Sequence, residues 1–177
     1  MKAVVRTTIM FTIVLASCGK PSAEEYMKKA EEAEKGGLWS LALENYQNIV
    51  KDHPGSVSAE IAAFNIAAIQ HNSLQNFQVA VDAYKLFLEQ YLDARKAPTA
   101  MFLVGFLYHN ELKNLDSAKV FYQRFLAKYP DNEMAISAQF ELQNLGKSPD
   151  EILAKPAVAE TSTPKSEVKA SSKLKNN

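Results

Sequence analysis

Two His-Asn pairs are the residues whose type and spacing come nearest to a reactive site. His71-Asn72 and His109-Asn110 occupy equivalent positions of a sequence repeat, and imidazole is both a metal ligand and an acid–base group. Each pair ends an apolar helical pattern, where histidine favours the helix dipole and asparagine tolerates a left-handed cap. Equivalent positions of stacked helices lie about 8–10 Å apart, too far for ligands about 2 Å from one ion. We therefore predict structural histidines, with no metal and no cofactor; the alternative is a metal-dependent enzyme.

Other patterns that carry chemistry are missing from the sequence. It has no glycine-rich phosphate loop, no nucleophile elbow and no zinc-ligand spacing. Basic residues do not gather around aromatic ones, as they do in nucleic-acid-binding proteins. One acidic cluster has the pattern of a solvated helix face: Glu24, Glu25, Glu31, Glu32 and Glu34. The sequence therefore predicts no enzyme, no small-molecule substrate and no nucleic-acid partner.

One apolar pattern occurs three times at one fixed spacing, which Tyr46, Tyr84 and Tyr122 define. Each copy sets a small residue four positions before its tyrosine, with bulky apolar residues three positions before and after this pair. Spacings of three and four residues place all of these side chains on one face of a helix. Self-similarity at this period marks a stack of helical units that bury their apolar faces together. The three copies are Trp39, Ala42, Tyr46 and Ile49; Phe77, Ala80, Tyr84 and Phe87; and Leu115, Ala118, Tyr122 and Phe125.

Capping residues predict seven helices in hairpins, followed by a short terminal helix near Pro149. Ser22 and Glu25 have the form of a capping box, which marks the start of the first helix. Gly36-Gly37 breaks the chain between the first two helices, because glycine adopts left-handed geometry. Asp131 is expected to cap the seventh helix, which then runs to about Leu145.

The N-terminus has the layout of a secretory signal. A basic start is followed by an apolar run at residues 9–15 and by Ala16-Ser17. The run is much shorter than the roughly 20 residues that span a bilayer. Leu15 to Cys18 resembles the cleavage box of bacterial lipoproteins, and Cys18 is the only cysteine.

That resemblance implies a cleaved signal peptide at residues 1–17, a lipidated Cys18 that bears palmitate-type acyl chains, and a linker at 18–22. Gly19 follows Cys18 where inner-membrane lipoproteins of the enteric type carry an acidic residue. We therefore expect a protein anchored in the bacterial outer membrane and facing the periplasm. The alternatives are an uncleaved anchor and an ordinary signal peptide with a chance cysteine.

The C-terminal residues 155–177 have a different composition from the rest of the chain. They contain no aromatic residue, and five lysines stand against two glutamates, a net charge of +3. Such a composition buries too little apolar surface to offset the entropy of ordering. We predict a disordered basic tail, which either improves solubility or tethers the protein to anionic wall polymer or lipid.

The helical region at residues 23–146 resembles the tetratricopeptide repeat family. That family places a small residue where two helices cross, an aromatic residue four positions on, and a proline after the hairpin. The second repeat departs from it, with Leu92 where proline is expected. The matching residues are Ala30, Gly37, Ala42, Tyr46 and Pro54, then Gly105, Tyr108, Ala118, Tyr122 and Pro130.

The resemblance implies an all-α fold at residues 23–154, an α-solenoid of about three repeats and a capping helix. It also implies a concave groove for a peptide segment of another protein, although the family's basic carboxylate clamp is missing here. For Leu103 and Leu107, a place in the core is an equal alternative. The groove positions are Met27, Glu31, Asn65, Ile69, Leu103, Leu107 and Asn110.

Together these patterns predict a non-catalytic, membrane-anchored protein-interaction scaffold of the cell envelope. Its layout resembles that of lipoproteins that help to assemble outer-membrane proteins and of periplasmic repeat proteins that coordinate envelope constriction. The alternative is a structural lipoprotein that associates with itself or bridges membrane and wall.

Overall fold

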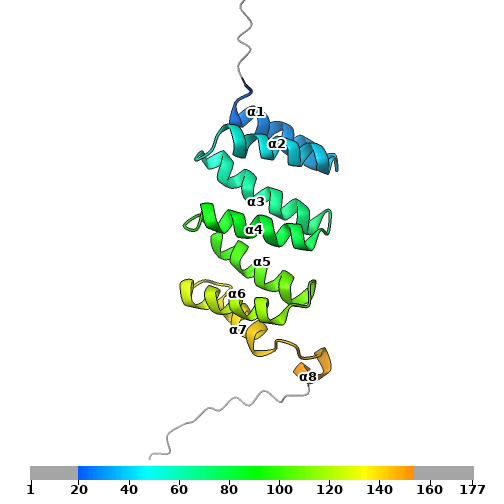
Figure 1. Cartoon of the computed structure of the whole chain (residues 1–177), viewed down its shortest axis with the longest axis vertical. Coiled ribbons are helices and arrows are strands. Elements are labelled where there is room, and N and C mark those ends of the chain that lie inside the picture. Colours follow the sequence, from blue (N-terminus) through cyan, green and yellow to red (C-terminus); the bar gives the residue numbers. More distant parts are fainter. Residues whose placement is uncertain (1–19, 154–177) are drawn as a thin grey trace, which may run out of the picture. The chain divides into compact units, whose positions relative to one another are not determined.

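The computed structural model describes residues 20–153, which form eight α-helices and, within this range, no strand (Figure 1). The predicted signal peptide, Cys18 and the predicted tail at 155–177 lie outside the described residues. The helices are α1 (Ala23–Lys35), α2 (Trp39–Asp52), α3 (Val57–Asn72), α4 (Phe77–Gln90), α5 (Ala97–Asn110), α6 (Leu115–Lys128), α7 (Ala135–Gln143) and α8 (Pro149–Leu153).

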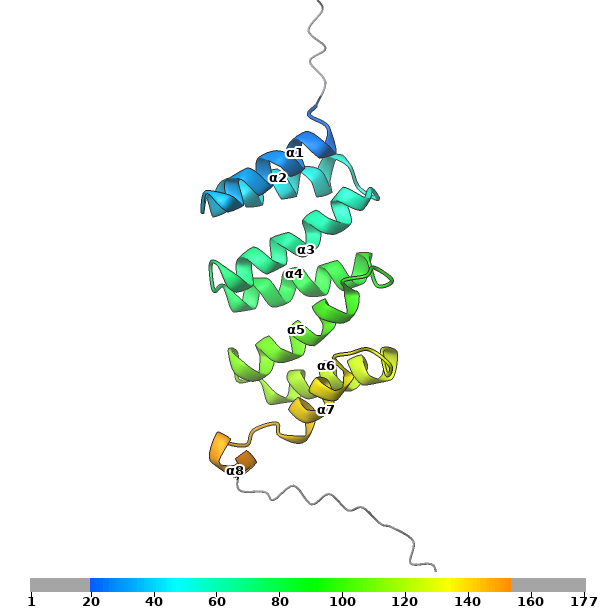
Figure 2. The ribbon, with the colours of Figure 1, turned by 180° about the vertical axis from the view of Figure 1, so that it is seen from behind.

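The first six helices form three hairpins that stack in chain order, and α7 packs on α6. The second helices α2, α4 and α6 share one side of the stack, and the first helices α1, α3 and α5 share the other (Figures 1 and 2). The predicted all-α solenoid is confirmed. Residues 20–145 belong to one compact unit, and α8 belongs to a second unit that begins at Gly146.

Several helix ends follow from capping residues in the sequence. The Ser22 hydroxyl accepts a hydrogen bond from the Glu25 backbone N–H, and the Glu25 carboxylate accepts one from the Ser22 N–H at 2.8 Å. Gly37 closes the first helix with a φ of +69°, in the left-handed region that glycine enters without a steric penalty.

The seventh helix differs from its prediction at both ends. It begins at Ala135 with Met134 at the cap position, and it ends at Gln143. Before it the backbone makes turns instead of a helix, because Asn132 N–H donates to the Tyr129 carbonyl and Ala135 N–H donates to the Asn132 carbonyl. The carboxamide of Asn132 also accepts from the Met134 N–H. The prediction that Asp131 caps this helix is therefore wrong: Asn132 stabilises the preceding turn, and no side chain caps the helix.

The recurring small and aromatic residues form the centre of the core. All six recurring alanines and tyrosines are buried: Ala42, Tyr46, Ala80, Tyr84, Ala118 and Tyr122. The alanines let the helix backbones approach, and the tyrosines fill the space between them. These alanines and tyrosines therefore occupy the same buried positions in each hairpin.

An aromatic residue of the first helix completes the packing in the second and third hairpins. The Phe64 ring on α3 lies 5.5 Å from the rings of both Tyr84 and Phe87 on α4. Phe102 on α5 repeats this arrangement against α6, at 5.7 Å from Tyr122. Such edge-to-face and tilted pairs add to the stabilisation that burial provides.

Candidate functional site

The first helices carry most of the residues that the sequence assigned to partner binding. Met27, Asn65, Leu103 and Asn110 are half-buried, and Glu31 is exposed. They belong to α1, α3 and α5, which run along one side of the stack (Figure 2). We call these five residues the first-helix face.

The assignment of Ile69 to this face is wrong, and Leu107 takes the place in the core that the sequence left as its alternative. They are only 3% and 0% exposed, and both belong to the hydrophobic core. The reason is the loop that follows each residue. Leu74 and Leu112 each donate a backbone hydrogen bond of 3.0 Å to the carbonyl of Ile69 and Leu107, respectively, and their side chains pack on the same clusters. The two residues therefore stabilise the end of a hairpin.

The polar part of the first-helix face is organised around the hydroxyl of Tyr46. This hydroxyl donates to the Glu34 carboxylate at 3.2 Å, and the side chain of Asn65 hydrogen-bonds to it from α3. Burial, and to a lesser degree Glu34 and Glu31, raises the pKa of Tyr46 to about 12, against the effect of Asn65. The phenol is therefore protonated at neutral pH and acts as a donor.

This arrangement brings together groups from three helices. Glu31 and Glu34 come from α1, Tyr46 from α2 and Asn65 from α3. Sequence analysis had grouped Glu31 with Asn65 but had placed Glu34 on a solvated helix face, whereas Glu34 is half-buried and bound to Tyr46. Carboxylate and amide oxygens at this end can accept hydrogen bonds from N–H groups of a bound chain.

The two repeated histidines have different surroundings. The ring of His71 packs on Phe77 and Tyr84 at 6.3 and 6.5 Å, burial lowers its pKa, and its Nδ1 has no hydrogen-bond partner in the described structure. In contrast, Nδ1 of His109 lies 3.1 Å from the Glu141 carboxylate on α7. Residues 20–153 contain no group of three or more His, Cys, Asp or Glu side chains placed to hold a metal ion.

The third histidine connects the start of the array to its first hairpin. His53, at the end of α2, donates from Nε2 to the Pro21 carbonyl at 3.0 Å. Next to it, the Lys20 ammonium lies 2.6 Å from the Asp52 carboxylate, and this hydrogen bond lowers the pKa of Asp52. These two contacts hold residues 20–21 against α2, although the sequence alone gave no sign of this pairing.

Comparison with known proteins bears on the same hairpins. Residues 99–132, which contain most of α5 and all of α6, match the family model described as Tetratricopeptide repeat. The chain is also similar to a solved structure, the Arabidopsis OM64 TPR domain, with 23% sequence identity and a TM-score of 0.51. This match covers 69% of the chain and 94% of that domain. The family model identifies one tetratricopeptide repeat at residues 99–132, and the solved structure supports the same fold for the stack. A search of curated proteins found no match.

The tetratricopeptide fold is typically a non-enzymatic scaffold for protein interaction, and neither comparison points to catalysis. At 23% identity the solved structure supports the fold alone. Among the helices of residues 20–153, none combines the length and apolarity that crossing a bilayer requires.

Proposed function

We propose that this protein is a membrane-anchored scaffold of the bacterial cell envelope that binds a segment of another protein on its first-helix face. Its anchor is the lipidated Cys18, its location is the periplasmic side of the outer membrane, and its process is the assembly of outer-membrane proteins. The tetratricopeptide repeat match and the hairpin stack support a scaffold. The anchor and the location rest on the signal and cleavage-box patterns of residues 1–18.

The observation that carries the binding proposal is the mixed chemistry of the first-helix face. The apolar side chains of Met27 and Leu103 are half-buried on this face, so part of each remains accessible to a bound segment. Around the Tyr46 hydroxyl the same side of the stack offers the carboxylates of Glu31 and Glu34. An extended or helical segment with one apolar anchor and nearby N–H donors fits this surface.

The first prediction concerns the partner. A photo-crosslinking amino acid at position 103, illuminated in intact cells, should capture one defined envelope protein. Val120 on α6 provides the matched control, because it is 49% exposed and lies on a second helix. Its crosslinker should not capture that protein.

Two results would overturn the proposed site. Equal capture of the same protein from positions 103 and 120 would mean that the first-helix face is not selective. Capture of only a second copy of this chain would favour the structural, self-associating lipoprotein instead.

A second prediction concerns the anchor. Cells given a labelled fatty acid should label the wild-type protein and not Cys18→Ser, because the chain has no other cysteine. The variant should leave the membrane fraction, since the acyl chains supply its membrane affinity. Ser17→Ala is the control, because it keeps a small residue before the cysteine and should leave labelling intact. Equal labelling of wild type and Cys18→Ser would exclude this anchor.

A further inference from the structure

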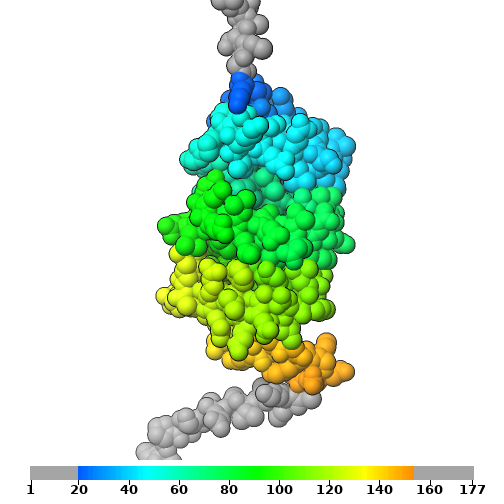
Figure 3. Space-filling model, viewed as in Figure 1, coloured from blue at the N-terminus to red at the C-terminus, as the bar shows by residue number. Residues whose placement is uncertain are grey.

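A second surface with its own chemistry lies on the opposite side of the stack, between α4 and α6. Two adjoining cavities of about 220 and 270 Å³ share Leu92 and Arg124 in their walls. They lie where the green surface of α4 meets the yellow-green surface of α6 in Figure 3. We call them together the α4/α6 furrow. The side chains that form its floor and its charged rim are Lys85, Leu88, Leu92, Phe121, Arg124 and Lys128.

The floor of the α4/α6 furrow is apolar. Leu88 and Phe121 are buried side chains of α4 and α6, and both line the cavity. Leu92 forms the rim and is partly exposed, and its carbonyl accepts a hydrogen bond from the Tyr129 hydroxyl at 3.1 Å. This bond links the rim to the segment that follows α6.

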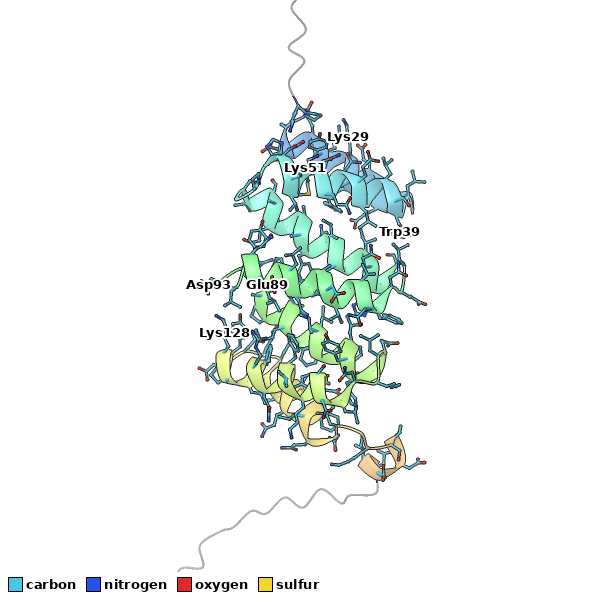
Figure 4. The ribbon with its side chains drawn as sticks, viewed as in Figure 1. Lys29, Trp39, Lys51, Glu89, Asp93 and Lys128 are labelled. Carbon is cyan, nitrogen blue, oxygen red and sulfur yellow. The ribbon has the colours of Figure 1, made fainter. Side chains whose placement is uncertain are left out.

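The rim is rich in positive charge. Lys85, Arg124 and Lys128 line the two cavities, against one carboxylate, Glu89. Lys128 lies 3.7 Å from the fully exposed Asp93, and Figure 4 shows Glu89, Asp93 and Lys128 at the same edge. Within residues 20–153, neither Lys85 nor Arg124 has a carboxylate within ion-pair distance.

Arg124 is oriented although it lacks an acidic partner. Its guanidinium carbon lies 5.3 Å from the centre of the Phe121 ring. A cation held over an aromatic face keeps its N–H donors at the edge of the stack. Guanidinium groups bind carboxylates with two parallel hydrogen bonds, so an acidic side chain is the natural complement.

The sequence repeat shows that two hairpins can stack without these cations and this apolar floor. At the equivalent boundary between the first and second hairpins, Lys85 is replaced by Gln47 and Arg124 by Leu86. The floor residue Phe121 is replaced there by Ala83. The first two hairpins stack without the cations and without the large apolar floor, which are features of the α4/α6 boundary alone.

We propose that the α4/α6 furrow binds an acidic peptide segment, with one apolar side chain on the floor and carboxylates on Lys85 and Arg124. Charge complementarity selects this occupant. Residues 155–177 of the chain itself have a net charge of +3 and are excluded by the same argument. The surface lies on the second helices, so it is independent of the proposed first-helix face.

The test uses a short fluorescein-labelled peptide in which aspartates and glutamates flank a central Leu-Phe pair. Fluorescence anisotropy at low ionic strength should show saturable binding to the full chain. Lys85→Gln/Arg124→Gln should weaken binding by about tenfold or more, because two charge-assisted contacts are lost. Replacing the Leu-Phe pair with serines should also weaken it. Lys51→Gln/Lys119→Gln removes the same charge from exposed lysines outside the furrow and should bind like wild type.

Several outcomes would overturn the proposal. The first is peptide binding that does not saturate with the wild-type chain. The second is an equal loss of peptide affinity in both double variants. The third is an NMR titration in which the peptide shifts amide signals of the first-helix face and not those of α4 and α6. Binding of phosphatidylglycerol vesicles without binding of the peptide would make the furrow a lipid site. Displacement of the peptide by a second copy of the chain, with a rise in mass by light scattering, would make it a self-association site.

Discussion

Tyr84→Ala is expected to lower the free energy of unfolding by about 3–5 kcal/mol, as truncation of a buried aromatic residue does. The side chain of Tyr84 is 1% exposed and contacts the rings of Phe64 and His71 at 5.5 and 6.5 Å. It belongs to the central hairpin, which has neighbours on both sides. Because the stability of an array depends on contacts between adjacent units, the loss affects both boundaries of that hairpin.

Thermal and urea denaturation followed by circular dichroism can measure this effect. The melting temperature should fall by on the order of 10 °C. Val79→Ala is the matched control on the same helix, because Val79 is half exposed and should change stability little. If Tyr84→Ala shifts the transition no more than Val79→Ala does, Tyr84 is not the central packing residue that we infer.

The same repetition explains why the fold was predictable from the sequence. Ala80 and Tyr84 have counterparts one repeat before and one repeat after them, so one local pattern was read three times. The two ends of the first helix could be predicted because Ser22 and Gly37 act through local backbone geometry. Both kinds of signal depend on residues that are close in sequence.

The surface chemistry was less predictable, because it depends on contacts between segments that are far apart. Ile69 lies one helical turn after Asn65 and shares its side of α3, yet the following loop covers Ile69 and leaves Asn65 half-buried. Helical periodicity cannot show how a loop folds back. The α4/α6 furrow likewise requires Lys85 and Arg124 to meet across a helix boundary.

The last helix of the stack shows a further limit of the pattern. Phe140 on α7 stands one repeat after Phe102, but it is 52% exposed. Phe102 is covered because α6 supplies Tyr122 and Phe125. One repeat after Tyr122 and Phe125, the sequence has Glu160 and Thr163. A repeat position is therefore buried only where its partner helix continues the pattern.

Gly105→Ala is expected to destabilise the protein by on the order of 1 kcal/mol, although alanine is the better helix former. A Cβ at this position would lie 2.9 and 3.0 Å from Cε1 and Cδ1 of the Tyr122 ring. The overpacking costs about 1–3 kcal/mol, and the higher helix propensity of alanine offsets about 1 kcal/mol of this. The ring is buried and lies against Phe102, so it has little room to move.

The decisive comparison repeats Gly105→Ala in a Tyr122→Leu background, with stability measured by urea denaturation. The hydroxyl of Tyr122 has no hydrogen-bond partner in the described structure, so Tyr122→Leu removes ring packing and breaks no hydrogen bond. With the ring gone, the Cβ loses its three nearest contacts, and the helix propensity of alanine should now stabilise the protein by up to about 1 kcal/mol. The sign of the effect should thus reverse between the two backgrounds, a coupling on the order of 2 kcal/mol. If Gly105→Ala has the same effect in both backgrounds, the close approach of α5 to Tyr122 does not explain the glycine.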